Sequence, residues 1–225
     1  MDWVHVTNFF AALLAILNPF GNIAHFLNFT TGDTPGVRRA MAFLVAGVVF
    51  IILSVFFIFG NAILSFMGIT LPAFQIGGGI LLLISGLSMV RGEMKKPPEK
   101  ILKGAGGDDY DKASSKLQHI LVPLAIPLIV GPGTISTAIL YAAGAREDGT
   151  FLAMLGVILI VSLIVLTCLL ASQWILNVIG ENGLQIMIRI LGLMLVAVGV
   201  QFLLNGLAKA TVGIINPDVA PPLKK

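Results

Sequence analysis

Apolar residues fill six stretches of the chain, and each is long enough to cross a lipid bilayer, which takes about 20 helical residues. The stretches cover residues 5–30, 37–59, 71–90, 118–144, 151–176 and 184–208. Between the third and the fourth, the sequence changes to a segment rich in Lys, Gly, Asp and Pro at residues 91–116. The pattern predicts an all-α, polytopic membrane protein with six transmembrane helices and a flexible, solvated linker.

Two of the six stretches contain a motif that a regular helix does not accommodate. The first holds Asn18-Pro19-Phe20-Gly21-Asn22, and the fourth holds Gly131-Pro132-Gly133-Thr134. Proline lacks a backbone N–H and clashes with the preceding turn, and glycine weakens the helix further. A broken helix is tolerated inside a membrane only where the break is buried in protein or lines a cavity. Helices 1 and 4 are therefore predicted to be broken, each beside a central binding site.

The two breaks have a common chemistry. After the first break we expect a new helix to start near Ile23 with Asn22 as its cap, and after the second we expect Thr134 to cap. The amino ends of these half-helices suit a carboxylate, and the freed carbonyls upstream suit an ammonium group, which together favour a small zwitterion. The predicted substrate-binding residues are Asn18, Pro19, Gly21, Asn22, Gly131, Pro132, Gly133, Thr134 and Ser136.

The two halves of the chain resemble each other. Asn18-Pro19 aligns with Gly131-Pro132, and Gln75 aligns with Gln185 when small gaps are allowed. Each half holds three spans, so the second half must insert upside down relative to the first, as in many secondary transporters. The predicted organisation is a first repeat at 1–90, the linker at 91–116, an inverted second repeat at 117–208 and a tail at 209–225.

Composition and charge support a membrane location. Hydrophobic residues make up 57% of the 225 residues, and charged residues make up 11%, against about 25% in soluble domains. Lys and Arg concentrate in the linker and in the loop with Arg38 and Arg39. By the positive-inside rule this side faces the cytoplasm, and both termini face outward from the cytoplasmic membrane. The net charge of +3 lies in loops between apolar spans and does not indicate nucleic-acid binding.

Four polar side chains within the spans are candidates for coupling or gating: His25, Gln75, Gln185 and Arg189. His25 could relay a proton near neutral pH, although a hydrogen bond to a neighbouring helix is the favoured interpretation. Interhelical hydrogen bonds are also the favoured role of the two glutamines. Arg189 lies about two turns from the cytoplasmic end, so a functional charge and a side chain that snorkels to the interface are weighted equally.

The other polar and small residues receive a structural interpretation. Gly77-Gly78-Gly79 is expected to allow tight packing against a neighbouring helix, and Cys168 to act as a small buried hydrophobe. No Asp or Glu lies within the six stretches. A carboxylate proton relay, a metal site, a cofactor or an enzyme active site is therefore not expected.

At these motifs the chain resembles the MarC family, which is also called the small neutral amino acid transporter (SnatA) family. The resemblance rests on Asn18-Pro19-Phe20-Gly21-Asn22 and on the run from Pro123 through Ser136, and it covers all six spans. It implies a six-span protein of the cytoplasmic membrane. It also implies transport of glycine and other small neutral amino acids by some members.

These observations together predict a secondary transporter of small neutral amino acids, with glycine or alanine as the best candidate substrate. Alternating access would rock the two repeats about the paired breaks. A proton is favoured over sodium as the coupling ion, because a site without a fixed anion would hold Na⁺ poorly. The alternatives are an exporter of other small solutes, a passive pore, and a membrane scaffold that transports nothing.

Overall fold

The described part of the chain is entirely helical where its structure is regular. The computed structural model describes residues 3–30, 32–92, 108, 130–145 and 149–215. Its helices are α1 (Trp3–Leu17), α2 (Pro19–Phe29), α3 (Pro35–Phe66), α4 (Leu71–Arg91), α7 (Pro132–Ala145), α8 (Phe151–Leu170) and α9 (Ser172–Ile215). The all-α prediction is confirmed for these residues. Most of the predicted linker, residues 118–129 of the fourth predicted span and residues 216–225 lie outside them.

Within the described residues, five helical segments are long and apolar enough to cross a membrane. They are Trp3–Ile23, Pro35–Phe66, Leu71–Arg91, Phe151–Leu170 and Asn182–Thr211. Gly133–Ala145, a shorter apolar helix, belongs to the fourth predicted span. A polytopic membrane protein is therefore the class that the described helices define.

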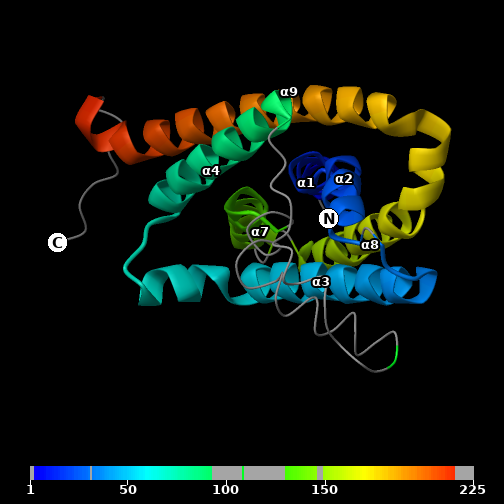
Figure 1. The fold of residues 1–225 in the computed structure, drawn as a ribbon. Helices are drawn as coiled ribbons and strands as arrows, with labels where there is room; N and C mark the ends of the chain where they lie inside the picture. The colour runs from blue at the N-terminus through cyan, green and yellow to red at the C-terminus, as the bar shows by residue number, and fades with distance from the viewer. Residues whose placement is uncertain (1–2, 31, 93–107, 109–129, 146–148, 216–225) are drawn as a thin grey trace.

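The helices form three layers (Figure 1). α4 and α9 lie along one side, α3 lies along the opposite side with α8 packed against it, and α1, α2 and α7 lie between the two. One apolar cluster fills the space between the middle layer and α3 with α8, and includes Phe9, Leu53 and Ile158. A second cluster joins the middle layer to α4 and α9 through Ile23 and Leu82. The broken first span is thus enclosed on both faces.

Threonine caps define the starts of two long helices. The Thr34 hydroxyl accepts a hydrogen bond from the Val37 N–H at 3.3 Å, and α3 begins with Pro35 directly after this cap. The Thr70 hydroxyl accepts from the Ala73 N–H at 3.3 Å at the start of α4. Both caps satisfy a backbone donor that has no partner within its own helix.

α4 and α9 run antiparallel and meet along a glycine seam. A Cβ atom at Gly79 would lie 2.8 Å from the Gly199 carbonyl oxygen, and one at Gly86 would lie 2.7 Å from the Gly192 carbonyl oxygen. The two backbones therefore touch at both levels, and only glycine fits there. Tight packing was expected of Gly79 and is confirmed, whereas Gly77 faces open space.

The turn between the fifth and sixth predicted spans lies where it was expected, but the fifth helix ends earlier than predicted. The fifth was expected to continue to residue 176, but α8 ends at Leu170 and α9 begins at Ser172. Within α9 the chain turns at Gly180, whose φ is 72° and ψ is 168°. Gly180 lies between the predicted end of the fifth span and the predicted start of the sixth, whereas Ser172 and Gln173, the polar residues that follow the end of α8, were included in the fifth span.

Candidate functional site

The first break, which we call the joint, consists of the single residue Asn18 between α1 and α2. α1 ends at Leu17, α2 begins at Pro19, and Asn18 between them has a left-handed backbone with φ 46° and ψ 66°. Asparagine is among the few residues other than glycine that tolerate this conformation. The Asn18 Oδ1 accepts a hydrogen bond from the Gly21 N–H at 3.1 Å, so Asn18 is the cap of α2.

The expected cap, Asn22, has a different role. α2 begins four residues earlier than Ile23, which places Asn22 inside its first turns. The Asn22 Nδ2 donates to the Leu17 carbonyl oxygen at 2.8 Å, and its side chain is buried. Asn22 therefore holds the carbonyl end of α1 against the start of α2, because that carbonyl has lost its own helical partner.

Only the helix that follows the second predicted break is described, because residues 109–129 lie outside the described part of the chain, and this helix also starts earlier than expected. α7 begins at Pro132, and the Gly131 carbonyl oxygen accepts from the N–H groups of Thr134 at 3.0 Å and Ile135 at 3.2 Å. Thr134 is therefore inside the first turn of α7, and its predicted role as the cap is wrong. Proline is suited to this first position, because its missing N–H would have no helical partner there.

Polar side chains follow the second break into the protein interior. Thr134, Ser136 and Thr137 are all buried. The Thr137 hydroxyl donates to the Gly133 carbonyl oxygen at 2.9 Å. The Ser136 Oγ has no hydrogen-bond partner within the described part of the chain. A buried hydroxyl without a partner costs stability, so its position one turn from the break calls for a ligand or a water molecule.

The two breaks pack against the same helix. Gly21 lies beside the Met89 side chain, since a Cβ there would come within 2.9 Å of the Met89 Cε. Gly133 lies beside Leu82, whose side chain a Cβ would overlap. Leu82 and Met89 are two helical turns apart on α4, so the breaks lie about 10 Å apart along its axis. The structure thus brings the predicted motifs to one face of α4.

Gln75, Gln185 and Arg189 lie in different surroundings, on α4 and α9. Gln75 is buried on α4 and its Oε1 has no partner among the described residues, whereas Gln185 is exposed. Their environments differ, although the sequence alignment made them equivalent. Arg189 is exposed, and its Nη2 lies 3.7 Å from where a Cβ at Gly92 would be, next to the carboxyl end of α4. His25 belongs to α2, but its side chain lies outside the described part of the structure.

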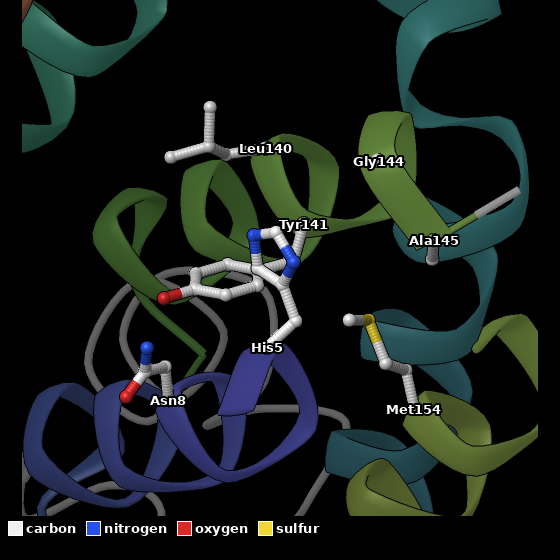
Figure 2. Close-up of a pocket in the computed structure, with 7 residues that line it drawn as sticks. All are labelled: His5, Asn8, Leu140, Tyr141, Gly144, Ala145 and Met154. Atoms are coloured by element: carbon white, nitrogen blue, oxygen red, sulfur yellow. The ribbon is translucent and has the colours of Figure 1, made fainter. Parts of the chain in front are cut away.

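A pocket of about 330 Å³ opens at the amino end of α1. It is lined by His5 and Asn8 of α1, by Leu140, Tyr141, Gly144 and Ala145 of α7, and by Met154 of α8. The His5 and Tyr141 rings meet edge to face with their centroids 6.3 Å apart (Figure 2). None of the seven side chains carries a permanent charge.

This pocket was not predicted from the sequence. His5 and Asn8 are polar residues three apart at the start of an apolar span, so they share one face of α1. This spacing of His5 and Asn8 is the sequence feature that could have indicated the pocket. Their partner Tyr141 comes from the other half of the chain, and only the fold brings it to them.

The apolar helices and the buried broken span define an all-helical integral membrane protein. The sequence matches the family described as "MarC family integral membrane protein" over residues 3–211. The chain belongs to the MarC family, and the resemblance noted from its motifs is confirmed at this level.

Similar proteins occur in bacteria and archaea. A UPF0056 membrane protein of Methanocaldococcus jannaschii is 37% identical over 212 residues, which cover 93% of this chain and 99% of the relative. A UPF0056 membrane protein of Aquifex aeolicus is 33% identical, and the match covers 88% of this chain and 90% of the relative. The UPF0056 membrane protein YhcE of Escherichia coli is 30% identical, and the match covers 92% of this chain and 94% of the relative. These names describe membrane proteins and specify no substrate. No solved structure matches the chain.

Proposed function

We propose that the chain is a secondary transporter of small neutral amino acids, with glycine or alanine as substrate. The observation that carries this proposal is that the buried break at Gly21 and the buried start of α7 at Gly133 both pack on one face of α4. Broken helices that meet inside a membrane protein are typical of transporter binding sites. The Asn22, Thr134 and Ser136 side chains offer neutral hydrogen-bonding groups there, and they are buried.

The size of the substrate follows from the surroundings of the breaks. The Leu82 and Met89 side chains occupy the space directly beside the two glycines. Little room is left for a substrate side chain unless these residues move. Helix amino ends at Pro19 and Pro132 attract a carboxylate, so a small zwitterion fits the proposed site better than a large cation.

We also propose that six spans form two inverted three-helix repeats. The helix contacts support this, because α4 packs on α7 as α9 packs on α2, and α3 packs on α7 as α8 packs on α2. The shift that aligns Asn18-Pro19 with Gly131-Pro132 also aligns Gly79 with Gly192 and Gly86 with Gly199. With this shift Gln75 no longer aligns with Gln185, so the glycine pairs replace the glutamine pair in the alignment of the repeats.

Labelled glycine and alanine uptake into proteoliposomes tests the transport proposal. Proton and sodium gradients are imposed separately, and we expect saturable uptake driven by the proton gradient. Flux without saturation would indicate a pore, and absence of flux for both substrates would support the scaffold alternative. Accumulation driven only by a sodium gradient would support the transporter proposal and would identify Na⁺, instead of the proton, as the coupling ion.

Ser136→Ala should separate binding from folding. The change removes a buried hydroxyl that has no partner among the described residues, so the thermal stability should be unchanged or higher. If the hydroxyl contacts substrate, the half-saturation concentration should rise about fivefold, which corresponds to a loss of ~1 kcal/mol. Asn22→Ala should lower both the thermal stability and the substrate affinity, because the Asn22 amide also donates a hydrogen bond to the Leu17 carbonyl oxygen.

The exposed Asn61 on α3 supplies the matched control, because Asn61→Ala should change neither uptake nor melting temperature. Uptake by Ser136→Ala that equals that of the unmodified protein would remove Ser136 from the site.

Single-cysteine labelling tests the proposed orientation, with outward termini and a cytoplasmic linker. In a Cys168→Ala background, Ser114→Cys should react with an impermeant maleimide only from the cytoplasmic side, although Ser114 itself lies outside the described residues. Asn61→Cys, at the far end of α3, should react only from outside. The reversed pattern would invert the orientation and leave the repeats intact.

A further inference from the structure

The pocket at the amino end of α1 has the dimensions and lining of a small-molecule site. Its volume of about 330 Å³ lies at the lower end of the range for ligand pockets, about 300–1,000 Å³. It is formed by α1 from the first half of the chain and by the consecutive helices α7 and α8 from the second half. A small molecule bound there would contact both halves of the chain.

Both hydrogen-bonding and apolar groups line the pocket. Figure 2 shows the His5, Asn8 and Tyr141 side chains close together between α1 and α7, with the Met154 thioether across from them. The imidazole, carboxamide and phenol can each donate a hydrogen bond, and the carboxamide and phenol can also accept one. Leu140 and Met154 offer apolar contact instead. This lining suits a polar ligand with a small apolar side chain.

Two helix ends of opposite polarity meet at the pocket. His5 lies in the first turn of α1, where the helix dipole is positive, and Gly144 and Ala145 lie in the last turn of α7, where it is negative. The seven lining residues supply no permanent charge to favour a net anion or cation. A zwitterion can place its carboxylate toward α1 and its ammonium group toward α7.

The pocket is distinct from the helix breaks. Asn8 lies about 15 Å from Asn18 along the axis of α1, at 1.5 Å per residue. Phe9 is fully buried beneath the pocket, with its ring centroid 5.1 Å from that of Tyr141 and 5.7 Å from that of Phe57. Neither Phe9 nor Phe57 lines the pocket, and Tyr141 packs against the apolar core that contains them.

We propose that this pocket is a second binding site, which takes small neutral amino acids at the end of the bundle that carries the amino end of α1. The choice of amino acid as ligand class rests on the proposed function, whereas the pocket and its polarity do not. Binding requires the hydrogen-bonding groups of Asn8 and Tyr141, so both are specificity-determining residues of the site.

Trp3 provides a reporter for this site. The chain has two tryptophans, Trp3 and Trp174, and Trp3 lies two residues before His5. In a Trp174→Phe protein, titration with L-alanine should change the Trp3 fluorescence in a saturable way. Propionate and ethylamine each lack one of the two charged groups of alanine, so each should bind at least tenfold more weakly.

Tyr141→Phe and Asn8→Ala test the lining directly in the same background. Each should raise the alanine concentration at half-maximal change at least fivefold, while size-exclusion elution and thermal melting show that the protein remains folded. Asn61→Ala, outside the pocket, should have no effect. A missing fluorescence response, or one that neither pocket variant weakens, would overturn the proposal.

Alanine flux measured on the same preparations keeps the two proposals separate. A saturable, variant-sensitive fluorescence change without flux would support the pocket and contradict the transporter. Flux without a fluorescence change would support the transporter and contradict the pocket.

Discussion

Gly79→Ala and Gly86→Ala should each destabilise the protein strongly, and the double variant should fail to yield folded protein. The added Cβ atoms would come within 2.8 Å and 2.7 Å of backbone carbonyl oxygens on α9. Backbone atoms cannot rotate away as a side chain can, so α4 and α9 must separate along their length. Overpacking of this kind costs about 1–3 kcal/mol at each position. Thermal melting of the purified protein in detergent measures the loss.

Gly77→Ala is the matched control for this prediction. Gly77 lies in the same helix, two residues before Gly79, and a Cβ there meets no atom within 4 Å. Alanine is the better helix former by about 1 kcal/mol, so this variant should melt at the same temperature or higher. If Gly79→Ala and Gly86→Ala melt like Gly77→Ala, the close approach of α4 and α9 is not real.

Leu82→Ala should widen the range of accepted amino acids, and Gly133→Ala should narrow it. The Leu82 side chain lies directly against Gly133 at the second break, where a methyl group would overlap it. On the proposed mechanism, Leu82→Ala should raise uptake of valine relative to glycine at least tenfold. Gly133→Ala should abolish uptake of alanine at concentrations that still support glycine uptake.

A double-mutant cycle tests the same contact without transport. Each single change should lower the melting temperature, one by leaving a cavity and the other by overpacking. The added methyl group fills part of the cavity, so the double variant should be more stable than the sum of the two losses by about 0.5–3 kcal/mol. Gly156→Ala, which meets open space on α8, is the neutral control. Additive losses would show that Leu82 and Gly133 do not touch.

Local sequence features predicted the elements better than their connections. The Pro19 motif marked the break between α1 and α2, and the Pro132 motif marked the start of α7, because a proline within an apolar run has a direct effect on the backbone. The identity of the cap at the first break was wrong. Asn18 and Asn22 are equally good caps by residue type, and only the left-handed backbone of Asn18 decides between them.

Features that depend on distant residues were not predictable in the same way. Gly79 was expected to pack closely, but nothing local identified Gly199 as its partner. Gln75 and Gln185 matched in a short alignment, although one is buried and the other exposed. Burial depends on the orientation of the whole helix, which the repeat alignment did not fix. Tyr141 reaches the pocket for the same reason, through packing of α7 on α1.

The joint at Asn18 also limits how the length of the chain can vary. One inserted residue there would turn α2 by about 100° relative to α1. Phe26 would then leave the first apolar cluster, and Ile23 would leave the second. The turn between α3 and α4 is different, because Gly68 there faces open space. Insertions and deletions should therefore be tolerated at that turn and excluded at the joint, where the number of residues matters as much as their identity.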